Sequence, residues 1–174
     1  MLNNDEYIPS NHTFEDCRNY LLSKLDDFID KKIEKYHLER IKMYELIDVV
    51  DYDATRLLKL KNIDTGIIEE CFDDSAVVSN NNFDFMQIGQ QYECKIKLFG
   101  KPLTERTSNS IICKVVNREV VIGQRAMVEV EINNSKYYIP RQKGSEYLDN
   151  DILNFHFTRK DLVQVNNIIH ADLL

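Results

Sequence analysis

The spacing of hydrophobic residues changes twice along this chain of 174 residues. From Phe14 to Ile47 apolar side chains recur every three to five positions, which predicts one long helix or two joined helices. Thr13, followed by two carboxylates, predicts the start of this helix, because its hydroxyl can accept a free backbone N–H. A second, shorter helical region is expected within residues 48–74, ahead of an exposed turn at residues 79–82.

The period shortens to two in the middle of the chain. Tyr92, Cys94, Ile96 and Leu98 alternate with polar residues, so they are predicted to form the buried face of a strand. Four further strands are expected at residues 111–116, 119–122, 126–132 and 135–139, with tight turns at residues 117–118 and 133–134.

The register of the last hairpin follows from its turn. Two asparagines at its centre, Asn133 and Asn134, tolerate the positive φ that a two-residue turn requires. The predicted cross-strand pairs are Ile132 with Ser135, Glu131 with Lys136, Val130 with Tyr137 and Val128 with Ile139. This register places a charge pair outside and apolar pairs inside.

After Pro140 the pattern again favours helices, at residues 147–153 and from Thr158, as N-cap, to Ile169. The predicted fold is therefore α+β: an N-terminal helical region, a small five-stranded antiparallel β-barrel of the OB or SH3-like kind, and short C-terminal helices. The corresponding segments are an acidic helical region at 1–82, a basic β-barrel module at 83–143 and a C-terminal helical segment at 144–174.

Charge follows these boundaries. Residues 1–86 hold 19 acidic and 10 basic residues, residues 87–143 hold 5 and 10, and residues 144–174 hold 5 and 2, for a net charge of -7. There is neither an apolar run long enough to cross a bilayer nor a signal-peptide pattern, so we expect a cytoplasmic protein, or one carried in a particle assembled there, without membrane contact. The 16 Asn, 18 Ile and 14 Lys are typical of an AT-rich genome, such as that of a low-GC bacterium, a phage or a large virus.

Several kinds of site are not expected. The histidines do not have the spacing of helical metal ligands, and the widely separated Cys17, Cys71, Cys94 and Cys113 are typical of reduced, packed thiols. No phosphate-binding glycine loop or nucleophile-elbow sequence occurs. We therefore predict no metal and no cofactor, and a protein that is not expected to be an enzyme.

One catalytic pattern stays open as an alternative. Asp84, followed by Glu93 and Lys95, resembles the D…E-x-K motif of the PD-(D/E)xK nucleases over about a dozen residues. The resemblance implies a metal-dependent nuclease in which the two carboxylates hold a divalent metal and the lysine orients water. Phe83 replaces the proline of the motif, and Glu-x-Lys also arises from ordinary strand alternation.

A second alternative is single-stranded nucleic-acid binding by the basic middle region. An OB-like barrel would need cations that follow the phosphates and an aromatic ring on which a base stacks. The candidate residues are Lys95, Lys97, Phe99, Lys101, Arg106, Lys114, Arg118 and Arg125.

The leading hypothesis is a non-enzymatic protein-protein interaction or assembly module, with a regulatory, inhibitory or particle-component role. A helix of about 30 residues spans roughly 45 Å, which is longer than a small barrel can cover. The apolar stripe of this helix can be a core face packed on the rest of the domain, but this length predicts that part of it contacts a second copy or a different chain. The predicted interface residues are Phe14, Leu21, Phe28, Tyr36 and Tyr44.

Overall fold

The chain divides into two compact units. A computed structural model describes residues 13–39, 42–141 and 151–174, with side chains described only as far as residue 29 in the first range. The first unit comprises residues 1–40 and the second residues 41–174. Among the described residues, the first unit contains one helix and the second contains all the strands.

The helix α1, Phe14–Glu39, begins where the sequence predicts. The Thr13 hydroxyl accepts a hydrogen bond from the backbone N–H of Asp16 at 3.3 Å. In return, the Asp16 carboxylate accepts from the backbone N–H of Thr13 at 2.9 Å. This reciprocal cap satisfies two donors that the first helical turn leaves without partners. The helix ends at Glu39, earlier than the predicted Ile47.

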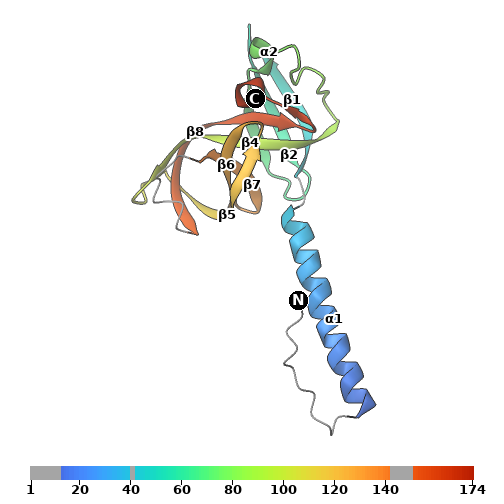
Figure 1. The fold of residues 1–174 in the computed structure, drawn as a ribbon. Helices are drawn as coiled ribbons and strands as arrows, with labels where there is room; N and C mark the ends of the chain where they lie inside the picture. Colours follow the sequence, from blue (N-terminus) through green and yellow to red (C-terminus); the bar gives the residue numbers. More distant parts are fainter. Residues whose placement is uncertain (1–12, 40–41, 142–150) are drawn as a thin grey trace. The chain divides into compact units, whose positions relative to one another are not determined.

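Among the described residues, the second unit contains nine strands in one mixed sheet, with the order β3-β2-β1-β4-β7-β6-β5-β8-β9. Figure 1 shows these strands together with the short helix α2. The strands are β1 Met43–Asp51, β2 Arg56–Asn62, β3 Ile68–Asp73, β4 Gln91–Leu103, β5 Ile111–Ile122, β6 Arg125–Ile132, β7 Ser135–Pro140, β8 Ile152–Val165 and β9 Ile168–Ile169. A short helix α2, Ser75–Val78, and a 3₁₀ turn η2, Ala171–Leu173, complete the unit.

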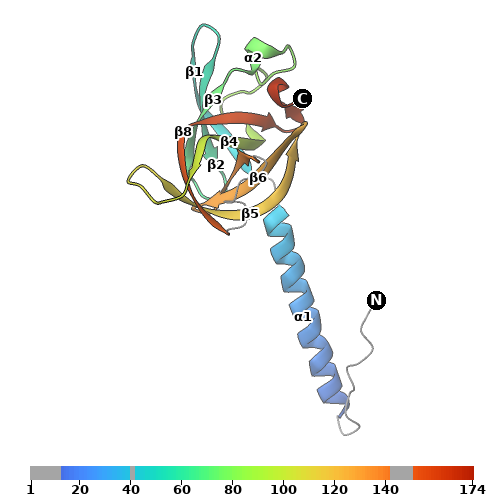
Figure 2. The ribbon, with the colours of Figure 1, turned by 60° about the vertical axis from the view of Figure 1, so that its left-hand side comes forward.

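The two longest strands, β4 and β8, pair with each other and organise the sheet. Their antiparallel ladder runs from Cys94 opposite Val165 to Leu103 opposite Asn154. On its other edge β4 pairs with β1 and with β7, while β8 pairs with β5 and, at a single bridge, with β3. From β4, the pairings run through β7, β6 and β5 to β8 in one direction and through β1, β2 and β3 to β8 in the other, and β8 pairs with β4. The strands curve around an interior (Figure 2).

Alternating side chains fill that interior. Tyr92, Cys94, Ile96 and Leu98 of β4 are each at most 8% exposed and belong to the main hydrophobic cluster, which confirms the predicted buried face. A smaller cluster on the other side of the sheet includes Leu173 of η2. The backbone N–H of residue 124 donates to the Leu173 carbonyl at 2.6 Å, so the C-terminal turn is tied to the turn between β5 and β6.

The predicted hairpin at residues 126–139 is confirmed pair by pair. β6 and β7 pair with Val128 opposite Ile139, Val130 opposite Tyr137, Glu131 opposite Lys136 and Ile132 opposite Ser135. Asn133 and Asn134 have φ values of 50° and 62°, as the turn requires. The predicted outward position of the charge is wrong, because Lys136 is buried and contacts the Glu129 carboxylate, itself largely buried, at 2.9 Å.

The predicted fold class is wrong. The second unit is one large mixed sheet of nine strands, not a small five-stranded OB or SH3-like barrel with helical regions around it. Residues 48–74 form parts of β1, β2 and β3 rather than a second helical region. The segment predicted as a helix capped by Thr158 is the second half of β8, followed by β9. Of the helix expected at 147–153, residues 147–150 lie outside the described residues.

β-Bulges account for the errors in β1 and β8, because an extra residue shifts the alternation of a strand. In β1 the register shifts between Leu46 and Asp48, so apolar residues repeat at a helix-like spacing of three. In β8 the ladder with β4 shifts twice, near residues 158 and 163. The strand pattern then imitates a helical one. The turn predicted at 117–118 is also wrong, because β5 continues through it with irregular pairing to β6.

Candidate functional site

The described part of α1 carries an exposed apolar stripe. Phe14, Cys17, Leu21, Leu25 and Phe28 follow one another at steps of three or four residues, so they share one face of the helix. Phe14 is 87% exposed, Leu21 66% and Leu25 52%. The polar Asn19 and Ser23 lie on the opposite face. We call these five residues the α1 stripe.

The predicted interface residues fall into three groups. Phe14, Leu21 and Phe28 are exposed members of the α1 stripe. Tyr36 lies in the same helix, but its side chain lies outside what the structure describes. Tyr44 does not belong to the helix at all, because it is a fully buried residue of β1 in the main hydrophobic cluster.

The candidate nucleic-acid residues of β4 interact with charged side chains of the same chain. The Lys97 ammonium lies 3.0 Å from the Asp161 carboxylate. Lys95 is partly desolvated, which lowers its pKa, while the carboxylates of Glu129 and Glu93 act in the opposite direction. Phe99 is half exposed, as base stacking would require. However, its ring is occupied on one side by the Arg159 guanidinium, at 4.8 Å from the centroid.

The other candidate cations are distributed over the end of β4, the loop that follows it, β5 and β6. Lys101 is exposed near the end of that strand, and Arg106 is exposed in the loop that follows. Lys114 faces Glu131 across the β5–β6 ladder. Arg118 forms an ion pair with Asp151 at 2.8 Å. The remaining candidate, Arg125, is exposed at the start of β6.

The residues of the nuclease alternative occupy different settings. Glu93 and Lys95 are two positions apart on β4 and interact electrostatically. Asp84 follows α2 and forms an ion pair with Arg56 of β2 at 3.3 Å. Over the part of the chain that the structure describes, no three His, Cys, Asp or Glu side chains form a group that could hold a metal ion.

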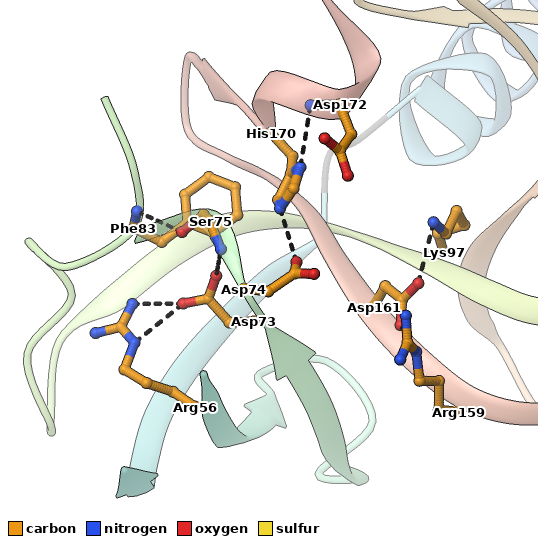
Figure 3. Close-up of polar contacts among 10 residues, drawn as sticks. All are labelled: Arg56, Asp73, Asp74, Ser75, Phe83, Lys97, Arg159, Asp161, His170 and Asp172. Atoms are coloured by element: carbon orange, nitrogen blue, oxygen red, sulfur yellow. Dashed lines mark hydrogen bonds and ion pairs between the residues drawn. The ribbon is translucent and has the colours of Figure 1, made fainter. Parts of the chain in front are cut away.

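Several buried ionic contacts were not predicted from the sequence (Figure 3). The Asp73 carboxylate is 2% exposed and accepts from the Arg56 guanidinium at 2.5 Å and from the Ser75 backbone N–H at 2.9 Å. The Ser75 hydroxyl then accepts from the Phe83 backbone N–H at 3.0 Å. These contacts fix the segment between β3 and β4, and they use the Ser75 hydroxyl structurally.

His170 fastens the C-terminal turn beside this segment. Its Nδ1 accepts from the backbone N–H of Asp172 at 3.3 Å, and its Nε2 lies 2.9 Å from the Asp74 carboxylate (Figure 3). A proton on Nε2 satisfies both contacts. Because both ring nitrogens are used in this way, the geometry gives His170 a structural role.

A groove opens on the outer face of the sheet between β3 and β8. It has a volume of about 770 Å³ and is lined by residues of β2, β3 and β8, including Lys59, Ile68, Phe72 and Arg159. The Arg159 guanidinium stacks 4.3 Å from the centroid of the Phe72 ring, and it also donates to Asp161 at 2.6 Å. We call this feature the β3–β8 groove.

A buried carboxylate joins the two strands beneath the groove. Glu69 of β3 is 1% exposed and contacts the Lys160 ammonium of β8. The Tyr137 hydroxyl donates to the same carboxylate at 2.5 Å. Burial and the Glu69 charge both raise the pKa of Tyr137, so its proton is retained. The sequence did not predict this buried ion pair, because Glu69 occupies an inward position of β3 that is normally apolar.

No protein-family model, curated protein or solved structure matches this chain. Neither helix in the described ranges combines the length and the apolar composition needed to span a membrane.

Proposed function

We propose that this protein is a non-enzymatic interaction or assembly module that binds another polypeptide through the α1 stripe. The observation that carries the proposal is the exposure of Phe14, Leu21 and Leu25 on one face of a capped helix. Fully burying a leucine or phenylalanine side chain contributes about 1.5–3 kcal/mol. A partner that covers this face would therefore gain several such contributions.

The spacing of the stripe defines the kind of partner. Apolar anchors at steps of three and four residues are the pattern by which a helix lies in an apolar groove or against a second helix. The positions that flank the stripe include the cations Arg18 and Lys24, which would remain solvated at the rim. We therefore propose an apolar groove or helix of another chain as the partner surface.

The two alternatives from the sequence have weaker support. Ion pairs within the chain engage Lys97 and Arg118, so their charges would add less to phosphate binding. In the nuclease alternative, the Asp84 carboxylate is paired with Arg56.

Site-specific photo-crosslinking in the full-length protein tests the proposal in the cells that produce it. A benzophenone amino acid replaces Leu25 in one sample and Ser23, on the polar face of the same helix, in the matched control. We expect a covalent adduct with another polypeptide, either a second copy or a different protein, from position 25 and little from position 23. Adducts from position 25 confined to the same chain would contradict the proposal.

A charge substitution gives the complementary test. Leu21→Glu combined with Leu25→Glu should abolish the association, because it places carboxylates in the middle of the apolar face. Asn19→Glu combined with Ser23→Glu adds the same charge to the polar face and should leave the association unchanged. Equal effects of the two pairs would mean that charge, not the stripe, controls binding.

A further inference from the structure

The basic residues of α1 gather around its apolar stripe. With 3.6 residues per turn, successive positions of a helix are about 100° apart around its axis. Arg18 and Lys24 therefore lie about 60° to either side of the centre of the α1 stripe. By the same spacing, the positions of the other three basic residues lie within about 80° of that centre. They are Lys31, Lys32 and Lys35.

The acidic residues of α1 occupy the opposite side of the helix. Six of its seven acidic residues are at positions about 120° or more from the centre of the stripe. They are Glu15, Asp16, Asp26, Asp27, Asp30 and Glu34. The seventh, Glu39, is the last residue of the helix and is on the stripe side. The apolar stripe is therefore bordered by positive charge along most of its length.

The charges of Arg18 and Lys24 are not compensated within the described part of the chain. Both side chains are exposed, and neither forms an ion pair with another described residue. The Lys24 ammonium lies 5.4 Å from the centroid of the Tyr20 ring, a contact that leaves its charge in place. On the sheet, by contrast, Lys97 and Arg118 are paired with carboxylates. The two cations beside the stripe can therefore attract carboxylates of a partner.

We infer that the α1 stripe binds an apolar groove bordered by carboxylates, on a protein other than a second copy of this chain. The inference rests on the proposed function and names the chemistry of the partner. Leu21 and Leu25 enter the groove, while Arg18 and Lys24 meet Asp or Glu side chains at its two edges. Complementary charges at the rim of an interface speed association and select the partner.

A second copy of the chain fits the stripe less well. Two α1 stripes packed face to face would bring cationic borders together, because a cation lies on each side of the stripe. This holds for both the parallel and the antiparallel orientation of the two helices. Like charges placed opposite each other across an interface disfavour that pairing. The acidic residues that could relieve the repulsion are on the far side of each helix.

A lipid surface also fits the stripe less well. Apolar helices with cationic borders can lie on membranes that contain anionic lipids. However, α1 has seven acidic and five basic residues, and the whole chain has a net charge of -7. An anionic lipid surface extends well beyond the stripe, so it would repel the rest of the molecule. A groove that covers only the stripe and its borders avoids this repulsion.

The test begins with the adduct formed by the benzophenone amino acid at position 25. Mass spectrometry identifies the captured polypeptide, which is then produced and titrated against the purified protein. Arg18→Gln with Lys24→Gln removes the cations beside the stripe, and Asn19→Glu with Ser23→Glu makes the same change in net charge on the polar face. We expect Kd to rise about three- to tenfold for the first pair and to change little for the second. The difference should shrink at about 0.5 M salt, because salt screens exposed charges.

A carbodiimide, which condenses an amine with a carboxylate without leaving a spacer, tests for acidic residues at the edge of the groove. In the purified complex we expect an amide link between Lys24 and an Asp or Glu of the captured polypeptide. Lys24→Arg keeps the positive charge but lacks the amine, so it should keep the affinity and lose this link.

The outcomes separate this inference from the proposed function. Absence of any adduct with another polypeptide from position 25 would overturn both. An adduct with a second copy of the chain, equal Kd values for the two variant pairs, or absence of the Lys24 link would overturn the inference alone. Binding to vesicles of phosphatidylserine that Arg18→Gln with Lys24→Gln abolishes, without any polypeptide adduct, would assign the stripe to a lipid surface instead.

Discussion

The α1 stripe and strand β4 both carry regularly spaced apolar residues, yet they end in opposite environments. On β4 the side chains of Ile96 and Leu98 are completely buried, because strands from distant parts of the sequence pair around them. On α1, Leu21 and Leu25 remain largely exposed. A sheet that returns to its own first strands buries its apolar face within one chain. A single helix cannot bury its apolar face against itself, so that face needs the surface of another element or another chain.

The comparison separates residues that hold the chain together from residues that are available for binding. Apolar residues of the sheet are committed to the hydrophobic clusters, so changing them should act on folding. Apolar residues of the α1 stripe are exposed on their helix and are proposed to bind another chain, so changing them should act on association. The predictions below test this division.

The largest effect is expected in the hairpin core. Val130 is fully buried opposite Tyr137, so Val130→Asp places an unpaired carboxylate in the main cluster. The cost is several kcal/mol, comparable to the whole stability of a domain of this size, and the second unit should unfold. Val121→Asp, at an exposed position of β5, is the control and should shift the melting temperature little. Circular dichroism during heating measures both, and a Val130→Asp protein that melts like the wild type would refute the burial argument.

A smaller effect is expected at the crossing of β4 and β8. A Cβ atom on Gly100 would lie 2.0 Å from the carbonyl oxygen of His156, so Gly100→Ala forces the two backbones apart. We expect a loss of about 1–3 kcal/mol in the free energy of unfolding by denaturant. Gly66→Ala meets no atom within 4 Å but has a φ of +72°, and should cost about 1 kcal/mol. A smaller loss at Gly100 than at Gly66 would contradict the close approach.

Thiol chemistry distinguishes the two regions without a large change in stability. Burial raises the pKa of the Cys94 and Cys113 thiols to about 12, and Cys71 is also buried with a raised pKa. Cys17 on α1 is partly exposed. Because the thiolate is the reactive form, an aromatic disulfide reagent at pH 8 should modify Cys17 quickly and the other three only on unfolding. In the control, Cys17→Ser, the rapid reaction should disappear. Rapid reaction of more than one thiol would contradict the burial of Cys71, Cys94 and Cys113 in the sheet.

Predictions from short-range signals are correct where the local pattern of residues is regular. The alternation from Tyr92 to Leu98 defined a buried face, the paired asparagines defined the hairpin register, and Thr13 defined the helix start. These features depend on residues that are close together in the chain. The sequence therefore predicted them without knowledge of the distant strands.

Long-range features were missed for physical reasons. Bulges in β1 and β8 broke the alternation, and the resulting spacing favoured helices instead of strands. The β3–β8 groove depends on where parallel pairing stops, which is set by strands 89 residues apart at Phe72 and Asp161. Arg159 looked like part of a helix in the sequence. Its position between Phe72 and Phe99 follows only from the sheet.

The most direct test of whether the α1 stripe serves binding rather than folding is the melting curve of the protein carrying Leu21→Glu and Leu25→Glu. If the α1 stripe serves binding, the sheet should melt cooperatively at the wild-type temperature under conditions where the associated form is absent from both samples. The Asn19→Glu and Ser23→Glu protein provides the reference for added charge. A large fall in melting temperature confined to the Leu21 and Leu25 variant would show that the stripe is part of the folded core, and would contradict the account.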